Sequence, residues 1–340
     1  MKINFTENQN EFINCPDKNI FLNACPGAGK TKAVVARYIK RAEELSRNFG
    51  RRSIAVLSFT NVAINEISDR CLKNNLPFLI HYPNYVGTFD SFLNRYFFRQ
   101  LVNHPLKQPI SVVESWDTVG AAVSCEYGSI PLSNFLFSGN SISLRKTNDF
   151  SVNVPYRKNP ERWNYLAEKL RQQYFSFGII SAEEVRNFIF PRIEKDDKIF
   201  NSLSKRFEEI IIDEIQDCNE QDLFILEKAR DYGCNIVMVG DLDQSIYRFR
   251  NVNLSKIEAF VSSHKPIKLT DNFRSTKIIC ELYSTLRHNN SIDNSGAEHA
   301  DLNIPIGLIF YKTLNKDIAD RFTSLLGELD ASIRDYKIIS

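Results

Sequence analysis

The chain has 340 residues, of which 43% are hydrophobic and 25% are charged, values that exclude a disordered chain and fit two or three packed units. Its 43 Lys and Arg nearly balance 41 Asp and Glu, so any nucleic-acid surface must be local rather than a property of the whole chain. Seven Cys without CxxC spacing argue against a disulfide framework or a zinc site, and neither a signal-like N-terminus nor an apolar run that could span a bilayer is present, so we expect a cytoplasmic protein without membrane contact.

Six short apolar runs, rich in Ile and Val, are predicted to be buried strands of a parallel sheet. In chain order they are Asn19–Ala24, Ser53–Phe59, Tyr85–Thr88, Glu209–Asp213, Asn235–Val239 and Pro266–Leu269. After the first of them, Ala33–Leu45 carries apolar side chains at helical spacing. Strand–helix alternation of this kind predicts an α/β fold.

Between about Gln100 and Phe207 the regular spacing of apolar, strand-like runs is lost, which predicts an inserted, mostly helical subdomain. Near the C-terminus a strand, a helix and the start of another strand are expected at Pro305–Tyr311, Lys316–Leu326 and Tyr336–Ser340. We therefore expect one sheet domain in two parts, an insertion, and the start of a second domain that the chain does not complete. The corresponding residues are 1–99 and 208–285, 100–207, and 286–340.

A glycine-containing segment lies between the first predicted strand and the helix after it, and it is Ala24-Cys25-Pro26-Gly27-Ala28-Gly29-Lys30-Thr31. Gly27 and Gly29 let backbone N–H groups approach a phosphate closely. Lys30 would reach the β- and γ-phosphates, and the Thr31 hydroxyl would bind Mg²⁺. The strict pattern begins with Gly where this chain has Ala24. A plain turn is the alternative, and Gly-Lys-Thr in this context favours phosphate binding.

Polar residues follow three other predicted strands. Asp213 and Glu214 end the strand from Glu209, where Asp213 would hold Mg²⁺ and Glu214 would take the proton of an attacking water. Gln244, after the next strand, could sense the γ-phosphate, and Arg274 could neutralise charge in the transition state. A solvated loop, a polar turn and a helix cap are the respective alternatives for these segments taken singly.

Taken together, these segments resemble the UvrD/Rep family of superfamily 1A DNA helicases from Phe5 to Ser275. The matching motifs I, Ia, Ib, II, III and IV are Ala24–Thr31, Ser58–Glu66, Gly87–Phe92, Ile211–Asp217, Gly240–Arg250 and Leu269–Ser275. The chain departs from the family with Asp90 where His is common, Ile215 where Phe or Ala is usual, and Phe273 where Tyr is common. The resemblance implies a RecA-like P-loop NTPase sheet followed by the start of a second RecA-like domain.

The resemblance also implies the residues of an ATP site. Its catalytic set is Lys30, Asp213, Glu214, Gln244 and Arg274, and its cofactor-binding set is Gln9, Ala24, Cys25, Pro26, Gly27, Ala28, Gly29, Lys30, Thr31, Lys32, Phe273 and Arg274. Gln9 matches the adenine-reading glutamine, although Thr6 and Gln9 also form a capping-box pattern, and both uses can coexist. Phe273 would stack on adenine, and Gln216 and Gln244 would couple the nucleotide state to DNA.

For DNA, the resemblance implies aromatic platforms, which a motor that moves on any sequence needs. Phe59 and Phe249 take the positions that stack on single-strand bases, with Phe249 where Trp is usual. Thr60, Asn61 and Thr88 would contact phosphates. Ordinary core packing is the alternative for each phenylalanine, since the chain contains 25 Phe.

The function implied is an ATP- and Mg²⁺-dependent helicase that moves 3′-to-5′ on single-stranded DNA and acts at single/double-strand junctions. DNA repair, replication and anti-phage defence stay open as settings, with a nuclease or another complex partner; Val62 and Asn251-Val252 favour an accessory or defence protein. Motifs V and VI are not found, so we expect the isolated chain to bind nucleotide but hydrolyse it weakly. The alternative is a non-catalytic DNA- or partner-binding regulatory protein, against which the intact catalytic set argues.

Overall fold

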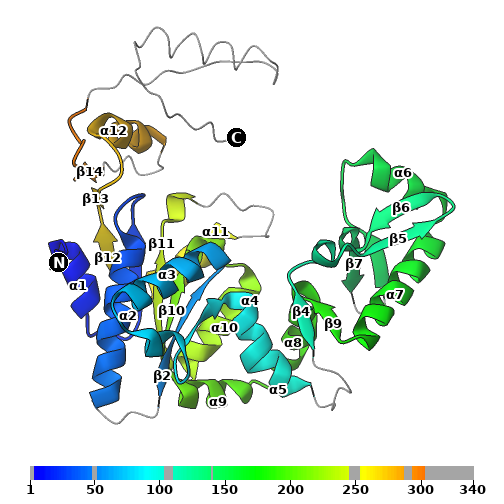
Figure 1. The fold of residues 1–340 in the computed structure, drawn as a ribbon, viewed down its shortest axis with the longest axis horizontal. Helices are drawn as coiled ribbons and strands as arrows, with labels where there is room; N and C mark the ends of the chain where they lie inside the picture. The colour runs from blue at the N-terminus through cyan, green and yellow to red at the C-terminus, as the bar shows by residue number, and fades with distance from the viewer. Residues whose placement is uncertain are drawn as a thin grey trace, which may run out of the picture. The chain divides into compact units, whose positions relative to one another are not determined.

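The computed structural model describes residues 4–47, 52–102, 110–138, 141–244, 253–286 and 293–302 (Figure 1). The chain divides into two compact units. The first combines Met1–Ala24 with Gly29–Leu269, and the second combines Cys25–Ala28 with Thr270–Ser340. No helix among the described residues is long and apolar enough to cross a membrane.

A six-stranded sheet in the order β12-β1-β11-β10-β2-β3 forms the centre of the first unit, and its neighbouring strands run parallel. Its strands are β1 (Ile20–Ala24), β2 (Ser53–Ser58), β3 (Tyr85–Thr88), β10 (Phe207–Asp213), β11 (Asn235–Gly240) and β12 (Lys265–Leu269). All six predicted strands are therefore confirmed, with small shifts at their ends. The mixed α/β fold with a central parallel sheet, expected for a RecA-like domain, is confirmed as well.

Helices cover this sheet, and its four inner strands β1, β11, β10 and β2 are accordingly buried on both sides. The described α-helices of this unit outside residues 111–193 are α1 (Glu7–Asn14), α2 (Lys30–Arg47), α3 (Asn61–Lys73), α4 (Phe89–Leu93), α5 (Arg99–Leu101), α9 (Ile199–Arg206), α10 (Glu220–Asp231) and α11 (Leu254–Ser262). Ile210 and Ile212 of β10 belong to the main core cluster with Leu226 of α10. Ile211, which points to the opposite face, is also fully buried.

The insertion has a core of its own, built around Trp163 and Trp116. Its elements are β4 (Ser111–Val113), β5 (Ala122–Cys125), β6 (Gly128–Pro131), β7 (Phe135–Ser138), β8 (Ser141–Leu144), α6 (Phe150–Lys158), α7 (Pro160–Ser176), β9 (Ile179–Ser181) and α8 (Ala182–Ile193). Strands β5–β6 and β7–β8 are antiparallel pairs, while β4 and β9 pair in parallel. These short strands were not predicted from the sequence.

In the second unit, β13 (Asp271–Asn272) pairs in parallel with β14 (Asn294–Ser295), and α12 (Lys277–Leu286) lies between them in sequence. The Ser295 hydroxyl donates a hydrogen bond to the carbonyl oxygen of Ser275 at 2.6 Å. The elements expected at Pro305–Tyr311, Lys316–Leu326 and Tyr336–Ser340 lie outside the described residues. The division of the chain into four segments stays a prediction.

Candidate nucleotide site and DNA-binding residues

The glycine-containing turn has the backbone that phosphate binding requires. Gly27 and Gly29 have φ of +73° and +75°, a conformation that glycine adopts without steric penalty. Strand β1 ends at Ala24 and α2 begins at Lys30, with the Ala33 N–H donating to the Gly29 carbonyl at 3.0 Å. The strand–turn–helix context is thus the predicted one. The first N–H groups of a helix have no partner within it, so the start of α2 provides donors for an anion.

Lys30 and Glu214 form an ion pair at the end of β10. The Lys30 Nζ lies 3.2 Å from Oε1 and 3.1 Å from Oε2 of the Glu214 carboxylate. Glu214 has φ +61° and ψ +52°, the left-handed region that non-glycine residues rarely adopt. Such a conformation costs on the order of 1–3 kcal/mol and persists where its surroundings fix it.

A chain of hydrogen bonds continues from Glu214 to the turn after β11. Gln216 donates from Nε2 to the Glu214 carboxylate at 2.6 Å and accepts at Oε1 from the Asp241 N–H at 3.2 Å. Asp241 accepts at Oδ2 from Nε2 of Gln244 at 2.7 Å. An amide serves at Gln216 because one end must donate while the other accepts. Lys30, Glu214 and Gln244, predicted from three separate segments, therefore belong to one hydrogen-bonded network.

Asp213 is the buried carboxylate beside this network, with 3% of its surface exposed. Its Oδ1 has no hydrogen-bond partner among the described residues. Burial and the neighbouring Glu214 charge raise the pKa of Asp213 to about 7, although Lys30 opposes the shift. A divalent cation would give the Asp213 Oδ1 a partner and would favour the charged form of the carboxylate, so Asp213 fits the predicted Mg²⁺ ligand. The described residues contain no cluster of three or more His, Cys, Asp or Glu suited to a metal, so Thr31, water and phosphate oxygens would complete the shell.

Gln9 forms the capping box that its sequence pattern allowed, and its side chain also reaches the phosphate turn, while its contact with adenine stays a prediction. It closes the capping box of α1, because its Oε1 accepts from the Thr6 N–H at 3.1 Å and its N–H donates to the Thr6 hydroxyl at 3.2 Å. Its Nε2 also lies against the phosphate turn, since a Cβ placed on Gly29 would come within 3.0 Å of it. Lys32 instead donates to the Asn4 carbonyl at 3.0 Å and lies over the Phe5 ring, a placement that lends no support to a nucleotide contact.

The second unit brings motif IV onto its part of the phosphate turn. The Phe273 N–H donates to the Gly27 carbonyl at 3.0 Å. The Asn272 Oδ1 accepts from the N–H groups of Arg274 and Ser275, both at 2.9 Å. A Cβ on Gly27 would lie only 2.6 Å from the Arg274 Cβ, so glycine is required there for packing as well as for its backbone conformation. Phe273 and Arg274 are exposed.

The predicted DNA-contact residues gather at the ends of β2 and β3, where Ser58 pairs with Thr88. Thr60 and Thr88 cap α3 and α4, and their hydroxyls accept from the N–H groups three residues further on, both at 3.2 Å. Phe59 stacks on Phe89 with ring centroids 5.6 Å apart and planes 9° apart. Asn61 is exposed at the start of α3, and the predicted Phe249 lies outside the described residues.

Residues 5–265 match the UvrD/REP helicase N-terminal domain. The chain belongs to this family. It is 25% identical over 301 residues to DNA helicase II of Haemophilus influenzae and 25% identical over 297 residues to that of Escherichia coli, in both cases over 84% of this chain and 40% of the relative. It is 22% identical over 309 residues to the ATP-dependent DNA helicase PcrA of Bacillus subtilis, over 83% of this chain and 39% of the relative.

A shorter match, 32% identical over 114 residues, joins 31% of this chain to 9% of an ATP-dependent helicase/nuclease component from Natranaerobius thermophilus. The chain thus spans about 40% of the length of the curated helicases that it matches most broadly. Membership of the UvrD/REP family confirms the resemblance that the motifs indicated.

One residue of the network was not predicted. Asp241 is 3% exposed and joins Gln216 to Gln244. The signal available in the sequence was an acid directly after a buried strand, the same signal that singled out Asp213. The larger Gly240–Arg250 segment drew attention to Gln244 instead.

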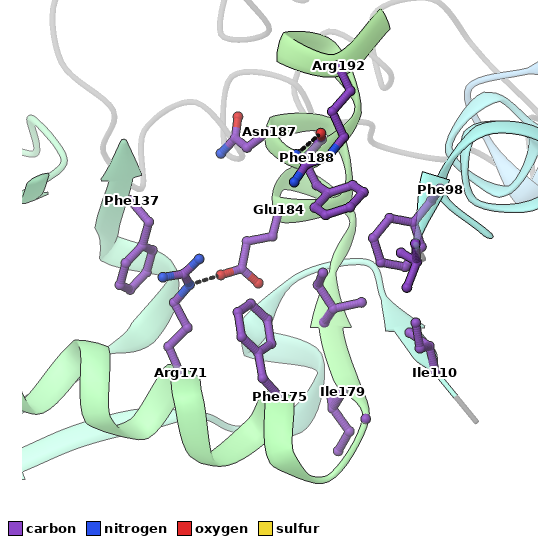
Figure 2. A pocket seen from close by; sticks show the side chains of 13 residues that line it. Phe98, Ile110, Phe137, Arg171, Phe175, Ile179, Glu184, Asn187, Phe188 and Arg192 are labelled. Carbon is purple, nitrogen blue, oxygen red and sulfur yellow. Dashed lines mark hydrogen bonds and ion pairs between the residues drawn. The ribbon is translucent and has the colours of Figure 1, made fainter. Parts of the chain in front are cut away.

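A cavity of ≈ 430 Å³ lies on the insertion side of the first unit, and none of the predicted site residues lines it (Figure 2). Four phenylalanines contribute to its walls, namely Phe98, Phe137, Phe175 and Phe188. The Arg171 guanidinium lies 4.7 Å and 4.8 Å from the ring centroids of Phe137 and Phe175 and donates to the Glu184 carboxylate. The charged pair in the wall is therefore already engaged, and this cavity offers no arrangement suited to nucleotide chemistry.

Proposed function

We propose that the chain is the nucleotide-binding part of an ATP- and Mg²⁺-dependent motor that moves on single-stranded DNA and separates duplex at single/double-strand junctions. The observation that carries the proposal is the network from Lys30 through Glu214 and Gln216 to Asp241 and Gln244. A module that only binds DNA or a partner has no use for this convergence of a lysine, two acids and two amides at the ends of three strands.

Lys30 neutralises Glu214 in the structure. A triphosphate carries more negative charge than one carboxylate, so it would draw the Lys30 ammonium toward its own oxygens. Glu214 would then keep its hydrogen bond from Gln216 and be available to accept the proton of an attacking water. Mg²⁺, held by Asp213 and Thr31, supplies charge neutralisation at the phosphates. Gln244 would report the state of the γ-phosphate to Asp241 and Gln216.

The ends of β2 and β3 supply the proposed DNA surface. Phe59 offers a ring for base stacking, and Thr60, Asn61 and Thr88 lie beside it at two helix starts. Movement in the 3′-to-5′ direction is proposed from the family resemblance. DNA repair, replication and anti-phage defence are the proposed settings, and the similarity to a helicase/nuclease component supports a nuclease as the kind of partner.

The test is nucleotide affinity of the wild type and Lys30→Ala, measured with a fluorescent ATP analogue with and without Mg²⁺, followed by ATP turnover with and without single-stranded DNA. Loss of the charge-assisted contacts is expected to weaken binding by roughly tenfold or more. Lys40→Ala, an exposed lysine on the same helix, is the matched control and is expected to bind as the wild type does. If the wild type and Lys30→Ala bound nucleotide equally well, and if DNA affinity were the same with and without nucleotide, the non-catalytic regulatory role would be supported instead.

A further inference from the structure

Arg186 of α8 joins two carboxylates from different parts of the first unit. Its Nε lies 2.8 Å from Oδ1 of Asp90 on α4, and its Nη1 lies 2.5 Å from Oδ1 of Asp222 on α10. The same guanidinium lies over the ring of Phe89, with Cζ 5.7 Å from the centroid. Phe89 is the residue on which Phe59 stacks.

Asp90 poses an electrostatic problem for a DNA surface. It stands one residue after Phe89 and is 46% exposed, so its carboxylate would repel a phosphate bound beside Thr88. Arg186 neutralises it while being only 14% exposed itself. The Arg186 guanidinium thus neutralises the Asp90 carboxylate beside the proposed DNA surface while remaining largely buried itself.

Asp222, the second carboxylate that Arg186 contacts, lies near the turn that carries residues of the candidate nucleotide site. It is 1% exposed and forms the capping box at the start of α10, accepting from the Asn219 N–H at 3.1 Å. The turn that holds Glu214 and Gln216 comes directly before this helix start. Arg186 therefore connects α10, the helix that follows this turn, to α4, the helix that carries Phe89.

We propose that Arg186 is a positioning residue that holds the Phe59–Phe89 pair in place for base stacking and joins it to the start of α10. This inference rests on the proposed function of the Phe59 surface. A planar fork of donors can meet two carboxylates while its face covers a ring, whereas a lysine ammonium is a point charge on a flexible stem. At Arg186 the guanidinium N–H groups bind both carboxylates while its plane lies over the Phe89 ring.

Arg186→Lys separates positioning from charge, because it keeps the positive charge that buried Asp222 requires. We expect its affinity for a fluorescently labelled oligothymidine to fall roughly three- to tenfold, part of the stacking contribution of one base. The slope of log Kd against log salt should not change, because the number of phosphate contacts is the same. Nucleotide affinity without DNA should also be unchanged. Arg162→Lys, in the exposed pair with Glu126 at 3.0 Å, is the matched control and should match the wild type.

A double-mutant cycle with Phe59→Ala completes the test. If Arg186 acts through the aromatic pair, Arg186→Lys has little further effect once Phe59 is gone. Three results would each overturn the inference: an oligothymidine affinity of Arg186→Lys equal to that of the wild type, losses of affinity from Arg186→Lys and Phe59→Ala that add in the double variant, or a smaller slope of log Kd against log salt. In each case a loss of affinity in Phe59→Ala would still support the DNA-binding proposal. Failure of the wild type to bind the oligothymidine would instead refute the proposed function, and the inference would fall with it.

Discussion

Arg37 provides the sharpest test of how the nucleotide site is held together. Its side chain is 1% exposed, and its Nε and Nη2 donate to the two Glu209 carboxylate oxygens at 3.2 Å and 3.1 Å. Its Nη1 donates to the carbonyls of Phe12 and Cys15 at 2.9 Å and 3.0 Å. One guanidinium thus joins the end of α1, the body of α2 and the start of β10, the elements that carry Gln9, Lys30 and Asp213.

Arg37→Met would leave the Glu209 carboxylate, itself 1% exposed, without its main partner. Breaking a buried pair in this way costs about 3–5 kcal/mol. The Arg41 Nε, 3.4 Å from the Glu209 carboxylate, recovers part of the loss. The Cys15 carbonyl loses its bond from Arg37, which adds roughly 1–3 kcal/mol where no water reaches it, whereas the Phe12 carbonyl keeps the bond from the Cys15 N–H at 3.4 Å. We therefore expect a net loss of about 3–5 kcal/mol in the free energy of unfolding.

The assay is urea unfolding of the nucleotide-free chain, followed by circular dichroism, for Arg37→Met, Glu209→Met and the double variant. Removing both charges abolishes the unpaired ion, so the double variant should be more stable than Arg37→Met by roughly 2 kcal/mol or more. Arg47→Met, which removes an exposed pair with Glu43 on the same helix, should change the free energy by less than about 0.5 kcal/mol. A double variant no more stable than Arg37→Met would refute the assignment of the loss to a stranded carboxylate.

Three further predictions test separate features. His264→Leu should reduce the loss of stability at acid pH. Burial lowers the pKa of His264 from its ordinary 6.5, so the neutral imidazole contributes its full stabilisation above pH 6.5, and this contribution is lost as the pH falls through the lowered pKa. Urea unfolding at several pH values would measure the change. Gly27→Ala should weaken nucleotide binding roughly tenfold or more, while Gly233→Ala, with φ +100° and open space around its Cβ, should affect stability alone. Asp213→Asn should raise the unfolding free energy of the nucleotide-free chain by roughly 1–3 kcal/mol and abolish the Mg²⁺ dependence of nucleotide binding; an unchanged Mg²⁺ dependence would remove Asp213 from the metal site.

The centre of the sheet could be predicted from the sequence because its inner strands β1, β11, β10 and β2 are buried on both faces, and so each forms a continuous apolar run between polar ends. The edge strands β3 and β12 are buried only in part. The strands of the insertion lack that signal. Ser111–Val113 and Ala122–Cys125 are only three and four residues long and are partly exposed. Runs of this length show no period that distinguishes a strand from a loop. Their existence depends on packing around Trp163, which lies far along the chain.

The candidate site divides in a similar way. Lys30, Asp213 and Glu214 follow buried strands within recognisable motifs, so their neighbourhood was predictable. Arg186 was not, because its partners Asp90 and Asp222 are 96 and 36 residues away and no local pattern marks such a pairing. An arginine on a helix surface is ordinary in sequence, and only the folded chain shows which carboxylates it joins.

The end of β10 concentrates features that stability alone would not select. Asp213 is buried with one carboxylate oxygen unpartnered among the described residues, and Glu214 directly after it adopts a left-handed backbone that glycine would take more easily. Both residues keep carboxylates where an apolar side chain and a glycine would fold with less strain. Strain of this kind persists when function requires the side chain. A carboxylate held beside Lys30 by a strained turn, next to a second, buried carboxylate, is the arrangement that we expect of a site that phosphate and a metal ion would stabilise.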